Sequence, residues 1–137
     1  MNFIDWNDSY SVGIRAIDNQ HKGLVDLVNQ LYNSMREGKE RAILEDIIEK
    51  LVQYTQIHFT YEEAFFKKFG YEKTDEHTRE HQEFIDEIIA FKRKFNRNKG
   101  EGALSIEMLQ FLSGWLFAHI KGADRDYIKC FHDHGLK

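Results

Sequence analysis

Proline is absent from this chain of 137 residues, and cysteine occurs only once, as Cys130. A lone cysteine cannot close an internal disulfide, and the stretch from Met1 to Tyr10 lacks the basic and apolar regions of a signal peptide. No apolar run approaches the roughly 20 residues that a membrane-spanning helix needs. These absences predict a soluble, cytoplasmic protein without a membrane partner.

Basic charge is also scarce, because 19 lysine and arginine residues stand against 23 aspartate and glutamate residues, for a formal net charge of -4. Proteins that bind nucleic acid instead gather an excess of lysine and arginine on one surface. Nucleic acid is therefore not an expected partner. The 42% hydrophobic and 31% charged residues are typical of a globular protein, and the length predicts a single domain over residues 1–137.

Without proline, glycine and the period of the apolar residues mark where helices end. Gly38, Gly70 and the stretch Gly100–Gly102 divide the chain into four helix-length segments, which follow a non-periodic arm over residues 1–17. In each segment, core-type residues recur at alternating intervals of three and four, the spacing of one helix face. The four stripes are His21, Leu24, Val28, Leu31 and Met35; Leu44, Ile48, Leu51, Thr55, His58, Glu62, Phe65 and Phe69; His77, His81, Phe84, Ile88, Phe91 and Phe95; and Leu109, Leu112, Leu116 and His119.

Four amphipathic helices joined by short connections pack as an up-down-up-down bundle. We therefore predict an all-α fold, in which a four-helix bundle spans about residues 18–121 and a short helical segment follows over residues 122–137. Asp18 is a candidate N-cap for the first helix.

Five of the seven histidines lie on these stripes, and two acidic residues lie beside them. A single helical histidine is more often a surface or structural residue, and an acid four residues after a histidine can simply form a hydrogen bond on the helix surface. Together, however, these side chains all point at the core, where an ionised carboxylate costs several kcal/mol unless it is paired or binds a cation. The sequence therefore predicts a metal centre. Its candidate ligands are His21, His58, Glu62, His77, His81, His119 and Asp124.

Asp124 follows His119 by five residues, which places it about 140° further around an ideal helix and away from the core. Gly122 lies between them and would allow the helix to loosen, so that Asp124 swings back. In the alternative interpretation, Asp124 merely caps the C-terminal segment. Glu63 lies off the stripe, and we expect no role for it in metal binding.

The types of ligand narrow the choice of metal. Structural zinc prefers four ligands and commonly uses thiolates, whereas this set offers seven nitrogen and oxygen donors and no cysteine. Imidazole with carboxylate suits non-haem iron, and two acids among five histidines favour two ions that share the carboxylates. If each ion takes about six donors, three histidines complete one ion and two leave the other a position short.

The motifs that carry these ligands resemble those of the hemerythrin family, and the whole chain is similar to a single-domain bacterial hemerythrin. They are IDNQHKGL with His21, HFTYEE with His58 and Glu62, HTREH with His77 and His81, and HIKGADRDY with His119 and Asp124. The resemblance runs from Trp6 to Tyr127. One departure is Gly23, where family members commonly carry a longer polar residue, and we expect it to loosen the first helix slightly.

The resemblance implies two non-haem iron ions, cycling between Fe2+ and Fe3+ and joined by an oxo or hydroxo bridge. It also implies that His77, His81 and His119 hold one iron and that His21 and His58 hold the other, with Glu62 and Asp124 bridging. Dioxygen is the implied ligand, bound reversibly for storage, delivery or sensing. Protein partners are not implied.

By the same resemblance, four apolar residues near the ligands would wall a dry oxygen pocket over the open iron: Leu24, Phe59, Trp115 and Ile120. The same residues can also be ordinary core. Tyr127 is a candidate hydrogen-bond partner of a ligand, whereas we expect the tail residues His132 and His134 to be solvated. The main alternative to an oxygen-binding protein is a di-iron enzyme acting on peroxide or nitric oxide. We expect no enzyme, because no unassigned acid or base lies next to the predicted pocket.

Overall fold

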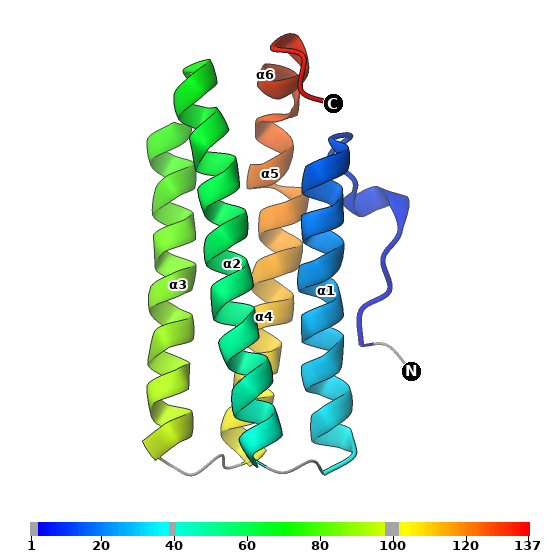
Figure 1. Ribbon diagram of the computed structural model, residues 1–137, viewed down its shortest axis with the longest axis vertical. Helices are drawn as coiled ribbons and strands as arrows, with labels where there is room; N and C mark the ends of the chain where they lie inside the picture. Colours follow the sequence, from blue (N-terminus) through cyan, green and yellow to red (C-terminus); the bar gives the residue numbers. More distant parts are fainter. Residues whose placement is uncertain (1–2, 39–40, 98–101) are drawn as a thin grey trace.

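The computed structural model describes residues 3–38, 41–97 and 102–137, and its described part consists of helices and connections without a strand. Four long helices form the body of the molecule (Figure 1): α1 (Arg15–Arg36), α2 (Arg41–Phe69), α3 (Thr74–Arg97) and α4 (Gly102–Lys121). Three short elements complete the chain: the 3-10 helix η1 (Asp8–Tyr10), α5 (Ala123–Asp126) and α6 (Ile128–Asp133).

The direction of the chain alternates along the bundle, so the predicted all-α, up-down-up-down arrangement is confirmed (Figure 1). Gly38 and Gly70 end α1 and α2 with φ values of 64° and 63°, the left-handed region that favours glycine after a helix. The expected break at Gly100 lies outside the described residues, as does the side chain of Phe95. Among the described residues, no helix is long and apolar enough to cross a membrane.

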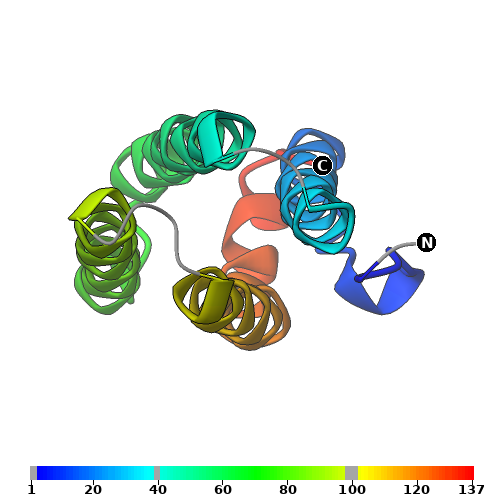
Figure 2. The same cartoon turned by 90° about the horizontal axis from the view of Figure 1, so that it is seen from below.

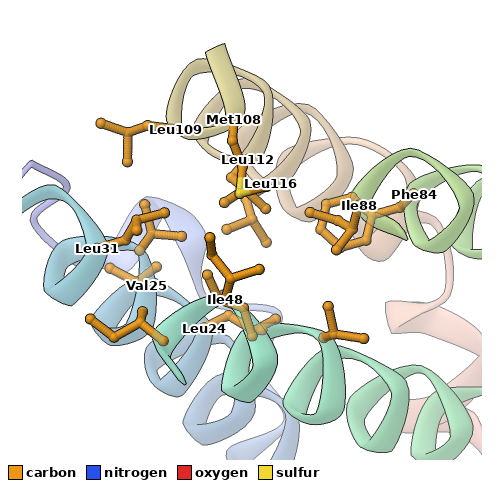
Figure 3. Close-up of a cluster of buried hydrophobic side chains, with 14 of the residues drawn as sticks. Leu24, Val25, Leu31, Ile48, Phe84, Ile88, Met108, Leu109, Leu112 and Leu116 are labelled. Carbon is orange, nitrogen blue, oxygen red and sulfur yellow. The ribbon is translucent and has the colours of Figure 1, made fainter. Parts of the chain in front are cut away.

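The four long helices surround one interior, which the view along the bundle shows (Figure 2). Leu24 and Val25 from α1, Ile48 from α2, Phe84 from α3 and several α4 residues point toward one another there (Figure 3). A second apolar cluster lies at the opposite end of the bundle. It contains Val12, Ile14, Ile17, Phe66, Tyr71, Tyr127 and Phe131.

The N-terminal arm is fastened to the outside of the bundle by side chains of α1. The amide of Asn29 is buried and makes two hydrogen bonds of 2.8 Å with the backbone of Ile4. Asp18 accepts from the Ser11 hydroxyl and from the backbone N–H of Val12. Our expectation that Asp18 caps the helix is therefore wrong, because α1 begins three residues earlier, at Arg15, and Asp18 uses its carboxylate to hold the arm.

One core position also differs from the predicted stripe of α2. Phe66 is fully buried, whereas Phe65 is only partly covered. Phe66 follows Glu62 by four residues, so a strict helical repeat places both on one face. Phe66 belongs to the second apolar cluster, whereas Phe59, on the same helix, belongs to the first. The predicted ligands His58 and Glu62 are therefore flanked by an apolar cluster on each side.

Candidate metal centre

The seven candidate ligands converge in the bundle, and all seven are buried. They fall into two groups, in each of which one potential ligand atom per residue lies within 4.8 Å of the others. Asp124 belongs to both groups, so its carboxylate can serve two ions at once. One group is His77, His81, His119 and Asp124, and the other is His21, His58, Glu62 and Asp124.

Helix geometry accounts for most of this convergence. His77 and His81 stand one turn apart on α3, and His58 and Glu62 stand one turn apart on α2. Because the chain alternates direction, the beginning of α1 and α3 and the end of α2 and α4 meet at one level of the bundle. Residues distant in the sequence thereby become neighbours: the ring centroids of His21 and His58 are 4.7 Å apart, and those of His77 and His119 are 4.6 Å apart.

Asp124 reaches the site because α4 ends at Lys121 and α5 begins after Gly122. A Cβ atom at Gly122 would lie 2.7 Å from the carbonyl oxygen of Ala118, closer than real Cβ contacts allow. The glycine therefore permits the close turn that brings the Asp124 carboxylate to 2.9 Å from Nε2 of both His77 and His119. This placement argues against the alternative in which Asp124 only caps the following helix.

The donor atoms inside the site form no hydrogen bond of good geometry and face one another as close histidine–carboxylate pairs, such as Nε2 of His58 and Oε1 of Glu62 at 2.6 Å. Both oxygens of Glu62 and of Asp124 are buried without a hydrogen bond, as is Nε2 of His21, His58 and His77. In addition, Nε2 of His81 and Nε2 of His119 face each other at 3.1 Å. Buried nitrogen and oxygen atoms that crowd around common points without well-formed hydrogen bonds fit cations, and the absence of thiolate from both groups fits iron better than structural zinc.

The pKa values of the two acidic ligands also favour a site for a cation. Burial favours the neutral acid and so opposes ionisation of Asp124, yet the charge of His119 and contacts with His21 and His77 hold its pKa well below the ordinary value. Burial and the charge of Asp124 also oppose ionisation of Glu62. The nearby His58 and His81 nevertheless hold the pKa of Glu62 below its ordinary value. Burial lowers the pKa of His81 to about 3, despite the nearby Glu62 carboxylate. Burial disfavours the charged form of His119, yet the Asp124 carboxylate raises its pKa above the ordinary value. The ionised acids and the neutral His81 are the protonation states that a metal ion requires, whereas an ion would have to displace the proton that His119 shares with Asp124.

Two polar residues that the sequence did not single out contact the outer nitrogens of ligand histidines, and a third lies farther away. Nδ1 of His58 lies 2.5 Å from Oε1 of Gln20, and Nδ1 of His81 lies 2.9 Å from Oε2 of Glu63. Glu80 stands 3.8 Å from Nδ1 of His119, too far for a hydrogen bond. Partners within hydrogen-bond distance, here Gln20 and Glu63, fix the orientation of a histidine so that its other nitrogen faces a metal. The contact between Glu63 and His81 was not expected for a residue that lies off the predicted stripe, and it makes the role of Glu63 in metal binding a question for experiment.

Adjacency in the sequence was the available signal for these partners. Gln20 precedes His21, Glu63 follows Glu62, and Glu80 precedes His81. A residue next to a ligand points away from that ligand's face, and in a bundle it can reach a histidine of the neighbouring helix.

Aromatic rings cover the three-histidine group. Phe59 stacks on His81 with ring centroids 3.7 Å apart, and Trp115 stacks on His119 at 4.2 Å. Leu24 and Ile120 are 2% and 3% exposed and belong to the apolar cluster that adjoins the site. Phe59 and Trp115, which were expected to wall a pocket over the open iron, thus stack on histidines of the other group, whereas Leu24 and Ile120 belong to the adjoining apolar cluster.

Other aromatic and histidine residues differ in their relation to the site. Tyr127 is fully buried, and burial together with the charges of Asp124 and Glu62 raises the pKa of its hydroxyl well above the ordinary value. His132 and His134 stay outside both groups but are not simply solvated. Nε2 of His132 donates to the carbonyl oxygen of Gly13, and the ring of His134 stacks on Phe69.

Comparison with known proteins gives consistent results. A family model described as the hemerythrin HHE cation binding domain matches residues 12–131. A bacteriohemerythrin of Pseudomonas aeruginosa PAO1 is 37% identical over 123 residues, covering 90% of this chain and 78% of the relative. A bacteriohemerythrin of Clostridium acetobutylicum is 34% identical, covering 90% and 97%. A myohemerythrin of Theromyzon tessulatum is 28% identical, covering 89% and 88%.

Solved structures show the same fold. The crystal structure of a wild-type hemerythrin superposes with a TM-score of 0.83 at 26% identity, covering 93% of this chain and 97% of the other. A mutant hemerythrin superposes with a TM-score of 0.84 at 26% identity, covering 95% and 98%.

Proposed function

Because this chain belongs to the hemerythrin family, we propose that it binds dioxygen reversibly at a non-haem di-iron centre, for oxygen storage, delivery or sensing. The centre would hold two iron ions that cycle between Fe2+ and Fe3+, with an oxo or hydroxo group between them. His77, His81 and His119 would hold one iron, and His21 and His58 the other. Glu62 and Asp124 would bridge them.

The observation that carries this proposal is the set of buried donor atoms without well-formed hydrogen bonds, divided unequally between two groups. One group has three histidines and the other has two, while Asp124 belongs to both. A group with fewer histidines leaves a coordination position for a small external ligand. Leaving these carboxylates buried without a cation would cost several kcal/mol.

When bound, the iron pair supplies the electrons and the open coordination position that dioxygen binding needs. The chain supplies orientation and a dry surrounding. Gln20 holds the ring of His58, and Glu63 holds the ring of His81, by hydrogen bonds to Nδ1. Leu24 and Ile120 exclude water from the side of the adjoining apolar cluster. Exclusion of water and protons favours release of intact dioxygen over oxidation of the centre.

Gas uptake and the visible spectrum test the proposal. The purified protein should contain two irons per chain without haem, and its reduced form should take up one dioxygen per iron pair and release it under vacuum. Sustained consumption of oxygen, peroxide or nitric oxide with added reductant, at rates far above the slow oxidation of the centre, would instead establish an enzyme. A metal count of one per chain would contradict the di-iron assignment.

The whole of residues 1–137 is proposed to act as one hemerythrin-like domain, composed of arm, bundle and C-terminal segment. A cytoplasmic location is also proposed, and the free thiol of Cys130 is compatible with it.

A further inference from the structure

Gly23 and Tyr54 form a close contact between α1 and α2. A Cβ atom at Gly23 would lie 2.1 Å from the hydroxyl oxygen of Tyr54 and 2.6 Å from its Cζ atom. Real Cβ atoms essentially never come within 3.0 Å of another heavy atom in this way. The ring of Tyr54 therefore occupies a space that glycine leaves open, and any larger residue at position 23 would require the ring to shift; we call this space the Gly23 notch.

The notch lies beside the two-histidine group of the metal centre. Gly23 stands on α1 between His21 and Leu24, and Tyr54 stands on α2 one turn before His58. Tyr54 is partly buried and packs against the apolar cluster that includes Leu24. Burial and then the negative charge of Asp26 raise the pKa of its hydroxyl.

The spacing of α1 and α2 matters more to this group than to the other one. Its histidines come one from each of these two helices, and their ring centroids are 4.7 Å apart. In the three-histidine group, two of the histidines share α3 and keep their spacing by helix geometry alone. The distance between two packed helices depends on the side chains at their contact.

We propose that Tyr54 is a positioning residue for the two-histidine group: seated in the Gly23 notch, it sets the spacing of α1 and α2 and closes their seam against solvent. The positioning role rests on metal binding alone. The closing of the seam rests in addition on the proposed oxygen binding. This role differs from the slight loosening that the sequence suggested for Gly23, because the glycine admits a large ring that fills the space.

A cycle of substitutions in the iron-loaded protein tests the notch itself. Gly23→Ala should lower the melting temperature when Tyr54 is present, because the added methyl group forces the ring out of the notch and its packing there is lost. In the Tyr54→Leu background, the same change should raise the melting temperature, since alanine favours a helix over glycine. Gly114→Ala on α4 is the matched control, because no atom lies within 4 Å of its added Cβ, and it should raise the melting temperature in both backgrounds. If Gly23→Ala changed the melting temperature equally in the two backgrounds, the proposed contact between Gly23 and Tyr54 would be wrong.

Iron release to a coloured chelator tests the positioning role. Gly23→Ala and Tyr54→Leu should each speed the loss of one iron per chain about tenfold, the size of effect typical for residues that orient metal ligands. The second iron should leave at nearly the wild-type rate, and Gly114→Ala should change neither rate. Tyr54→Leu adds no atom to α1 and so keeps the test independent of a clash. Unchanged release from both variants, despite altered melting temperatures, would show a packing contact only and overturn the proposal.

Oxidation of the oxygenated protein in air tests the closed seam. Tyr54→Leu should speed this oxidation several-fold while both irons are still present at the start. An unchanged oxidation rate would overturn the closing role and leave the release experiment to decide positioning. If the wild-type protein failed to bind dioxygen reversibly, the proposed function would be wrong. The melting and iron-release experiments would still show whether Tyr54 positions the two-histidine group or only packs between the helices.

Discussion

Gly122→Ala is the most direct test of how the chain builds the metal centre. The added Cβ would lie 2.7 Å from the backbone oxygen of Ala118, and a backbone atom cannot move aside as a flexible side chain can. The chain must therefore change its path between α4 and α5. A regular continuation of α4 would place Asp124 about 140° away from His119. The substitution should thus remove the one carboxylate that both ligand groups share.

The size of the effect follows from two opposing contributions. Alanine favours a helix over glycine by about 1 kcal/mol, whereas overpacking costs about 1 to 3 kcal/mol or more. For a chain of this length, each kcal/mol shifts the melting temperature by about 3 to 5 °C. The metal-free variant should therefore melt between the wild-type temperature and about 10 °C below it. The iron-loaded comparison should show a larger gap, because binding no longer stabilises the variant.

Iron content and thermal melting with and without iron together provide the assay. Gly114→Ala serves as control, because it adds the same methyl group to α4 in open space. We expect the control to keep two irons and the Gly122→Ala protein to lose at least one. A Gly122→Ala protein that retained both irons, with the iron-dependent gain in melting temperature unchanged, would refute the role assigned to the break after α4.

Further substitutions separate ligands, supporting residues and bystanders. Glu62→Ala should lose at least one iron. His132→Ala breaks only a hydrogen bond to the backbone of the arm and should keep both irons. Iron loss from the His132 variant would contradict the set of ligands. Glu63→Ala should weaken iron binding about 10- to 100-fold in chelator competition, and wild-type affinity would show that its contact with His81 is incidental. Leu24→Ala should cost about 2 to 5 kcal/mol of stability and speed oxidation of the oxygenated form with both irons retained. An unchanged oxidation rate would show that Leu24 does not exclude water from the site.

Much of the fold could be predicted from the sequence, because helical periodicity is a local property. The stripe through His21 and Leu24 and the pair His77 and His81 each follow from spacing along one helix. Short connections at Gly38 and Gly70 then force neighbouring helices to run antiparallel. Four stripes that must bury themselves together bring their histidines to a common interior, so the metal centre was predictable as a gathering of residues.

Other features could not be predicted, because they depend on which side chain faces which across two helices. Glu63 and Gln20 lie off the predicted stripes, and only the packing of α2 against α3 and α1 brings them to Nδ1 of His81 and His58. Helical spacing assigned Phe65 to the core, although the face that carries Glu62 buries its neighbour instead.

The sequence by itself determined the helices, their order and the set of residues that meet inside the bundle. Only the tertiary structure decided how these residues divide into two groups, which outer residues hold them, and that Gly23 admits the ring of Tyr54. The physical reason is one of range. Periodicity and glycine breaks act over a few neighbouring residues, whereas the rotation and spacing of packed helices are set jointly by every side chain at their contact.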